Sequence, residues 1–137
     1  MEKEIAGLVY KETTFLNVDL DLFSRSDLQP LVTALGRKVH ILFVGRDTQT
    51  YRAHLELSRD PKSVGVAIRR FAALISKLPR MERKLWDGAK VRDFNVGVQV
   101  AMRPHAYEIP ISIEAIEIAS TLKARIVFTI YAPEKTS

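Results

Sequence analysis

The stretch Phe15–Phe23, with the sequence FLNVDLDLF, decides the fold class, because apolar and polar residues alternate along it with a period of two. Successive side chains of a β-strand point to opposite faces, so the alternation predicts a strand with one apolar and one polar face. A strand of this kind belongs to a sheet that packs on one side and meets solvent on the other. The predicted apolar face carries Leu16, Val18, Leu20 and Leu22, and the polar face carries Asn17, Asp19 and Asp21.

Four later stretches are predicted to complete this sheet, because they are rich in β-branched and aromatic residues or repeat the alternation. The short connection between the first two of them predicts a β-hairpin. Gly97, in the middle of the third, indicates a bulge or a close approach of two backbones. The four stretches are residues 38–45, 51–58, 90–102 and 125–132.

Helices are predicted between the strands from start signals and from apolar residues at helical spacing. Ser26 with Gln29 forms a capping-box pattern, Asp60 precedes a proline, and Ser112 is a further N-cap candidate. A short additional helix is expected over residues 80–87. The predicted buried faces are Leu28, Leu31, Val32 and Leu35; Val64, Ile68, Phe71, Ile75 and Leu78; and Ile113, Ile116, Ala119 and Leu122.

The resulting element order is β-α-β-β-α-(α)-β-α-β, and it predicts an α+β fold. We expect a single domain over residues 1–137, built as a two-layer sandwich. One layer is a mostly antiparallel five-stranded sheet, to which the last strand can add a parallel pair. The other layer is formed by the helices, which all cover the apolar side of the sheet.

The composition narrows the classes of protein and site that need to be considered. The chain of 137 residues has 47% hydrophobic and 27% charged residues, which is typical of a globular protein. It contains no cysteine, which excludes disulfides, thiolate metal sites and cysteine nucleophiles. The N-terminal residues do not resemble a signal peptide and no apolar run is long enough for a membrane span, so we expect a cytoplasmic protein.

The net charge of +5 is unevenly distributed. Residues 59–92 hold ten basic and three acidic residues, so this segment carries +7 and the rest of the chain −2. A basic segment can bind nucleic acid through phosphate contacts, although a solvated helix surface has the same composition. The candidate phosphate contacts are Arg69, Arg70, Lys77, Arg80, Arg83 and Lys84.

The C-terminal half carries a family resemblance. An alternating strand at residues 94–100 is followed by a loop, a short helix that begins at Ser112, and a final strand that ends in the pattern hydrophobic-Thr-hydrophobic-Tyr at Phe128–Tyr131. This arrangement resembles an uncharacterised bacterial domain family of unknown function, the 4279-type. The resemblance implies the same order of strands and helices, and it supplies no catalytic residues.

The polar sheet face is the first candidate site. If the predicted strands adjoin, carboxylates, amides, an imidazole and a guanidinium gather on it, which suits acid/base chemistry or a hard cation. The structural alternative is a wet sheet face on which Arg52 pairs with Glu56. The candidate residues are Asn17, Asp19, Asp21, Arg52, His54, Glu56, Asp93, Asn95 and Gln99, with Thr129 and Tyr131 on a further strand.

The loop around residues 103–108 is the second candidate site. Proline stiffens it, and Arg and Tyr are favoured anchors in protein interfaces, so it suits the binding of a partner. The candidate partner-binding residues are Arg103, His105, Tyr107 and Glu108.

The sequence contains no catalytic or cofactor motif. It has neither a Gly-x-x-x-x-Gly-Lys-Ser/Thr loop, a Gly-x-Gly-x-x-Gly turn nor a Gly-x-Ser-x-Gly elbow, and no metal-loop spacing. We therefore expect no cofactor and no metal, and we favour a protein-interaction or self-associating module that works through the open sheet face, an edge strand or the loop. Two alternatives stay open: nucleic-acid binding through residues 59–92, and a metal-assisted or acid/base enzyme that uses the polar sheet face.

Overall fold

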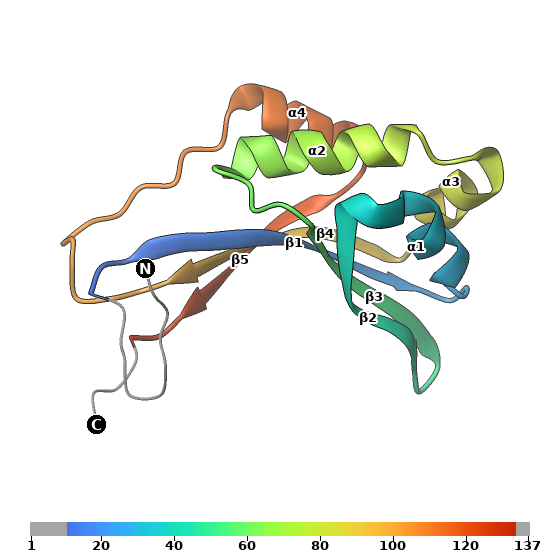
Figure 1. Cartoon of the computed structure of the whole chain (residues 1–137), viewed down its shortest axis with the longest axis horizontal. Coiled ribbons are helices and arrows are strands. Elements are labelled where there is room, and N and C mark those ends of the chain that lie inside the picture. Colours follow the sequence, from blue (N-terminus) through green and yellow to red (C-terminus); the bar gives the residue numbers. More distant parts are fainter. Residues whose placement is uncertain (1–10, 134–137) are drawn as a thin grey trace.

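A computed structural model of the chain describes residues 11–133. Its helices lie on one face of a five-stranded sheet (Figure 1). The elements are β1 (Thr14–Ser24), α1 (Gln29–Leu35), a 3₁₀ turn (Gly36–Lys38), β2 (Val39–Asp47), β3 (Thr50–Leu57), α2 (Val64–Ser76), α3 (Arg80–Asp87), β4 (Val91–Gln99), α4 (Ile113–Thr121) and β5 (Arg125–Tyr131). This order confirms the predicted α+β fold.

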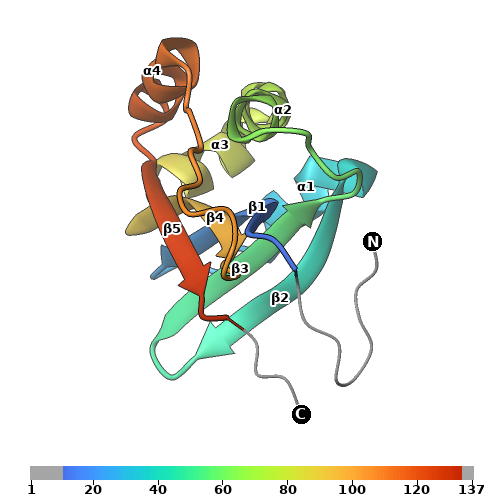
Figure 2. The ribbon, with the colours of Figure 1, turned by 90° about the vertical axis from the view of Figure 1, so that its left-hand side faces the viewer.

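The sheet has the strand order β2-β3-β1-β4-β5, so the alternating strand β1 lies at its centre. Three of the four strand pairs are antiparallel, and β4 and β5 are parallel. A parallel pair needs a crossover, which α4 and its loops provide. Seen from the end of the sheet, all helices lie on the same side and the opposite face is uncovered by helices (Figure 2).

The core lies between the sheet and the helices. The helix α2 presents Ile68, Phe71 and Ile75 to the sheet, and all three are fully buried. The rings of Phe71 and Phe94 on β4 have centroids 5.8 Å apart. Trp86 of α3 is buried as well, and its Nε1 donates a hydrogen bond to the carbonyl of Leu122 over 3.2 Å. The burial confirms the faces predicted for β1 and α2, except that Leu16 of β1 is not in the core and Leu78 lies beyond the end of α2 and is half-buried.

The exception on β1 is Leu16, which does not face the core. A β-bulge shifts the register of β1 against β4 between Phe15 and Asn17, so Leu16 is the extra residue. Phe15 then packs against the core, while Leu16 is 37% exposed and lines the polar face. The bulge lies opposite Gly97 and Val98 of β4. The glycine therefore did mark an irregularity, but the extra residue is on the partner strand.

Two helices begin later than their sequence signals predicted. α1 has Leu28 as its N-cap with no side-chain cap, so Ser26 does not form a capping box. Instead, an Asp27 oxygen accepts the backbone N–H of Gln29 over 2.9 Å. α2 is capped by Ser63, whose hydroxyl accepts the N–H of Val66, and not by Asp60.

The helix α4 has its predicted cap, and Ala119 and Leu122 are buried as predicted, but the first half of its predicted buried face is exposed. The Ser112 hydroxyl accepts the N–H of Ala115 over 3.1 Å. Ala115 and Ala119 face the core, whereas Ile113 and Ile116 are 76% and 50% exposed. Alanines on the inner face allow α4 to lie close to α2, and this close packing decides which face is buried.

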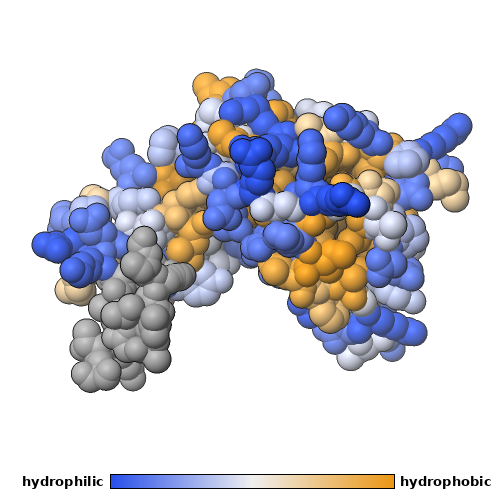
Figure 3. Space-filling model, viewed as in Figure 1, coloured by the Kyte–Doolittle hydropathy of each residue, from blue (hydrophilic) through white to orange (hydrophobic). Residues whose placement is uncertain are grey.

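Apolar side chains also lie at the surface over the β2–β3 hairpin (Figure 3). They belong to Ile41, Leu42 and Phe43 of the edge strand β2, which are 52%, 48% and 40% exposed. A second register shift, between Ile41 and Phe43 against β3, makes Leu42 a bulged residue. Three successive exposed apolar residues on a sheet edge are unusual, because edge strands tend to carry protective charges.

Candidate functional site

The strand order brings the predicted polar residues of three strands together on the open sheet face. Asp19 of β1 lies opposite Glu56 of β3 on one side and opposite Asn95 of β4 on the other. Two residues further along β1, Asp21 lies between His54 of β3 and Asp93 of β4. Residues directly opposite each other across two strands are near enough to interact. Because β1 lies at the centre of the sheet, its alternating polar residues meet polar residues of β3 and β4 and form a cluster with them.

A chain of hydrogen bonds runs through this cluster from β5 to β3. The Thr129 hydroxyl donates to Oδ1 of Asn95 over 2.7 Å, and Nδ2 of Asn95 donates to Oδ2 of Asp21 over 3.1 Å. The other Asp21 oxygen accepts a hydrogen bond from Nδ1 of His54. Nε2 of His54 lies 3.4 Å from Oδ2 of Asp19. The imidazole is therefore held between two carboxylates, with its orientation set by Asp21.

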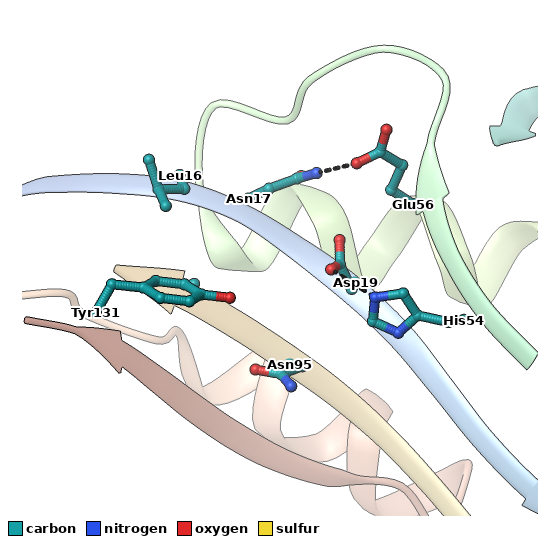
Figure 4. A pocket seen from close by; sticks show the side chains of 8 residues that line it. Leu16, Asn17, Asp19, His54, Glu56, Asn95 and Tyr131 are labelled. Atoms are coloured by element: carbon teal, nitrogen blue, oxygen red, sulfur yellow. Dashed lines mark hydrogen bonds and ion pairs between the residues drawn. The ribbon is translucent and has the colours of Figure 1, made fainter. Parts of the chain in front are cut away.

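A hollow of about 200 Å³ adjoins this chain (Figure 4). Glu56 on its β3 side accepts a hydrogen bond from the Asn17 amide over 3.1 Å. Tyr131 lies across the hollow from Glu56 (Figure 4). The lining residues are Leu16, Asn17, Asp19, His54, Glu56, Asn95, Gly97 and Tyr131.

Gly97 lines the hollow next to the Tyr131 ring. A Cβ at position 97 would lie 3.8 Å from the ring carbon Cε2 of Tyr131 and 3.8 Å from the Leu16 Cβ. These are ordinary contact distances, so one methyl group fits without displacing its neighbours, and a larger side chain would enter the hollow. The residue thus sets the depth of the hollow next to the ring.

Asp19 has an unusual proton affinity. Burial raises its pKa from 3.8 to about 6; His54 lowers the pKa, and the carboxylates of Asp21 and Glu56 raise it. A carboxyl group that titrates near neutral pH is able to exchange protons under physiological conditions. The cluster therefore combines a titrating carboxyl, an oriented imidazole and a hollow.

Three of the predicted polar-face residues are engaged elsewhere. Arg52 does not pair with Glu56; it lies 3.3 Å from Asp47 and stacks over the rings of Phe23 and Phe43. The other two, Asp93 and Gln99, are also held away from the hollow. Asp93 accepts two hydrogen bonds from the Arg125 guanidinium, at 2.7 and 2.8 Å, and Gln99 donates to the carbonyls of Val100 and Ala132.

The cluster contains carboxylates and an imidazole, but the described residues do not arrange them as a metal site. Within residues 11–133, no group of three or more His, Asp or Glu side chains is arranged to hold a metal ion. The side-chain amides of Asn17 and Asn95 already donate hydrogen bonds to Glu56 and Asp21. The arrangement is suited to accepting hydrogen bonds from a ligand and to moving protons.

The loop at residues 103–108 is exposed, and two of its groups anchor it to the start of β1. The Tyr107 hydroxyl accepts the backbone N–H of Phe15 over 3.1 Å. The carbonyl of Arg103 accepts the N–H of Thr13 over 2.7 Å. The side chains of Arg103, His105 and Glu108 lie at the surface, so the role of this loop in partner binding stays a prediction.

The basic residues lie on α2, α3 and the turn between them, and half of them make local contacts. Arg69 lies 3.3 Å from Glu114, Arg83 lies 3.3 Å from Asp87, and Arg70 donates to the carbonyl of Arg59 over 3.3 Å. Lys77, Arg80 and Lys84 are exposed. Nucleic-acid binding by this segment stays a prediction.

Sequence reasoning missed the apolar edge formed by Ile41, Leu42 and Phe43. These residues were assigned to a strand, but a run of apolar residues does not distinguish a central strand from an edge strand. Only the strand order distinguishes a central strand from an edge strand, and the strand order cannot be read from the sequence. In residues 11–133, no other strand pairs with the outer edge of β2.

None of the helices described is long and apolar enough to cross a membrane. No known family model, curated protein or solved structure gives a significant match to this chain. The resemblance to the 4279-type bacterial family accordingly stays a prediction.

Proposed function

We propose that this protein is a self-associating interaction module whose edge strand β2 pairs antiparallel with β2 of a second copy. The observation that carries the proposal is the run of three exposed apolar residues, Ile41, Leu42 and Phe43, on a strand with a free edge in the described part of the chain. Pairing of two such edges would satisfy backbone groups and bury these side chains at once.

The bulge at Leu42 limits the registers that a two-fold symmetric pair can adopt, and we propose one of them. Val39 and Ile41 face the core side, as do Val44 and Arg46 beyond the bulge, because each pairs with a core-side residue of β3. Paired residues of an antiparallel sheet must share a face. This condition is met when Ile41 lies opposite Val44 of the second copy, and Val39 lies opposite Arg46.

The same register places opposite charges at both ends of the contact. Lys38, directly before β2, then lies opposite Asp47 of the second copy, and the two-fold axis repeats this pair. Between these ends, residues 41–45 carry no charge. The contact would thus have an uncharged centre and a pair of opposite charges at each end, which supports a second copy as the partner. Exposed ion pairs contribute little affinity by themselves.

Sedimentation equilibrium over a wide concentration range tests the proposal. We expect a dimer for the original chain and a monomer for the double variant Leu42→Thr/Phe43→Thr, whose threonines favour β-structure and leave the core untouched. Ile130→Thr on the opposite edge strand is the matched control, because Ile130 is 57% exposed. It should leave the dimer intact.

Two results would overturn the proposal. One is an original chain that is monomeric up to millimolar concentration. The other is a dimer that survives Leu42→Thr/Phe43→Thr but is lost in the Ile130→Thr variant, which would assign the contact to β5. Far-UV circular dichroism of each variant establishes that it is folded before its mass is compared.

A further inference from the structure

We propose that the hollow on the open sheet face binds a guanidinium group, with Asp19 and Glu56 as hydrogen-bond acceptors and the Tyr131 ring as a stacking wall. This inference goes beyond self-association, because it uses the polar face of the sheet and not the edge of β2. It rests on the shape of the hollow, on its charge and on the kinds of group that line it.

The hollow presents acceptors on one side and an aromatic ring on the other. Asp19 and Glu56 lie directly opposite each other on β1 and β3, so their carboxylates approach the hollow from neighbouring strands. The Tyr131 ring lies across from them (Figure 4). A guanidinium is planar, donates hydrogen bonds from its edge and stacks through its face. It therefore matches both walls at the same time, whereas an ammonium group has no flat face.

The negative charge at the hollow has no matching cation among the described residues. Asp19, Asp21 and Glu56 gather around one imidazole, and no described lysine or arginine forms an ion pair with any of the three. Arg52 and Arg125, arginines of the sheet at polar-face positions, are paired with Asp47 and Asp93. Burial is the main cause of the raised pKa of Asp19, and the carboxylates of Asp21 and Glu56 add to it. A bound cation would relieve this repulsion.

The hollow is neither a plain acidic surface nor an apolar pocket. The Asn17 amide donates a hydrogen bond of 3.1 Å to Glu56, so one of the two proposed acceptors is already oriented. Gly97 lines the hollow without a side chain, so a residue larger than alanine at this position would fill part of it. Oriented acceptors reduce the ordering cost of binding.

Titration with methylguanidinium chloride, followed by NMR of the Asn95 side-chain amide and the Tyr131 ring, tests this inference. We expect saturable shifts at these two residues. In Asp19→Asn and in Glu56→Gln the affinity should fall about tenfold, because each change removes one charged acceptor. Asp60→Asn, an exposed carboxylate away from the sheet face, is the matched control and should leave the affinity unchanged.

The Gly97 series provides an independent steric test. Gly97→Ala should keep at least part of the binding, because its methyl group meets only ordinary contacts, whereas Gly97→Leu should abolish it by filling the hollow. Melting temperatures of both variants establish that they are folded. Methylguanidinium shifts that are equal in the original chain, Asp19→Asn and Gly97→Leu, or the absence of saturable shifts, would overturn the inference.

The guanidinium can belong to a free small molecule or to an arginine side chain of another protein. Titration with arginine amide and with an extended peptide that carries one central arginine separates these sources. A peptide that binds about tenfold more tightly than arginine amide indicates a protein partner, since only the peptide can gain contacts outside the hollow. Equal affinities indicate a small molecule.

Discussion

His54 and Asp21 lie directly opposite each other on β3 and β1, and Nδ1 of the imidazole donates a hydrogen bond to Oδ1 of the carboxylate. The second Asp21 oxygen accepts the Asn95 amide over 3.1 Å. One carboxylate thus joins three neighbouring strands at the centre of the sheet. Its loss leaves two donors without their partner, one on each adjoining strand.

The variant Asp21→Ala should therefore destabilise the protein. Hydrogen bonds to a charged group each contribute about 1.5–3 kcal/mol, and water can reach the partly exposed imidazole, so we expect a net loss of about 1–3 kcal/mol in the free energy of unfolding. Urea denaturation at neutral pH measures this change. Asp60→Ala, at an exposed position, should change the free energy by less than about 0.5 kcal/mol. Equal effects of the two variants would contradict the bridging role of Asp21.

Asp19 should make the stability depend on pH in the opposite direction from most carboxylates. Its pKa in the folded protein is about 6, above the ordinary value of 3.8, so the folded state holds this proton more tightly than the unfolded state does. The resulting stabilisation is complete below pH 3.8 and is lost as the pH rises to about 6. A shift of this size corresponds to at most about 3 kcal/mol, and partial exposure of the side chain reduces it.

Comparison of the original chain with Asp19→Asn measures the contribution of the Asp19 charge, including its interaction with the facing groups His54, Asp21 and Glu56. The variant lacks the charge, so its stability relative to the original chain should increase between about pH 4 and pH 7. Urea unfolding at several pH values measures the difference. A difference that is constant over this range would show that Asp19 does not titrate there.

The sequence predicted the sheet well because a period of two directly reports which side chains share a face. It therefore identified Asp19, Asp21 and His54 as members of one polar face. It could not predict that Asp19 adjoins Glu56 and Asn95, because strand order depends on contacts between distant parts of the chain. The bulge at Leu16 was missed for the same reason, since a bulge is defined only by its partner strand.

The buried face predicted for α4 was right at Ala119 and Leu122 and wrong at Ile113 and Ile116. Ala115, which the prediction did not include, is buried in their place, because a small alanine suits the packing of α4 against α2. The packing of α4 against α2 therefore determined its buried face at these positions, and the apolar pattern did not. The cap at Ser112 was correct, because capping depends on local geometry.

This orientation predicts opposite responses on the two faces of α4. Ile113→Ser, at a position that is 76% exposed, should change the free energy of unfolding by less than about 0.5 kcal/mol. Ala115→Val should destabilise by about 1–3 kcal/mol, because Ala115 is fully buried and two added methyl groups overpack a buried site. Urea denaturation of both variants distinguishes the faces. A larger effect of Ile113→Ser would restore the orientation that the sequence predicted.

Tyr107 has a structural contact that the loop sequence did not indicate. Its hydroxyl accepts the backbone N–H of Phe15, so Tyr107→Phe removes an acceptor at the start of β1. We expect a loss of about 0.5–1.5 kcal/mol, because this site is exposed and water replaces part of the bond. Differential scanning calorimetry measures it, with His105→Ala in the same loop as the control. An unchanged melting temperature for Tyr107→Phe would show that this hydrogen bond does not stabilise the fold, and partner binding would be the only role left for the tyrosine hydroxyl.

The proposed register of the β2 pair makes a prediction about charge reversal. Lys38→Asp places a carboxylate opposite Asp47 of the second copy, twice in the dimer, so it should raise the dissociation constant about tenfold at low salt. Asp47→Lys alone should weaken the dimer as well, and it also removes the 3.3 Å contact with Arg52. The double variant Lys38→Asp/Asp47→Lys restores opposite charges at both ends and should recover most of the affinity.

Sedimentation measurements at low and high salt test this, because screening should reduce the differences among the four proteins. Failure of the double variant to recover affinity would reject this register while leaving open the contribution of Leu42 and Phe43 to self-association.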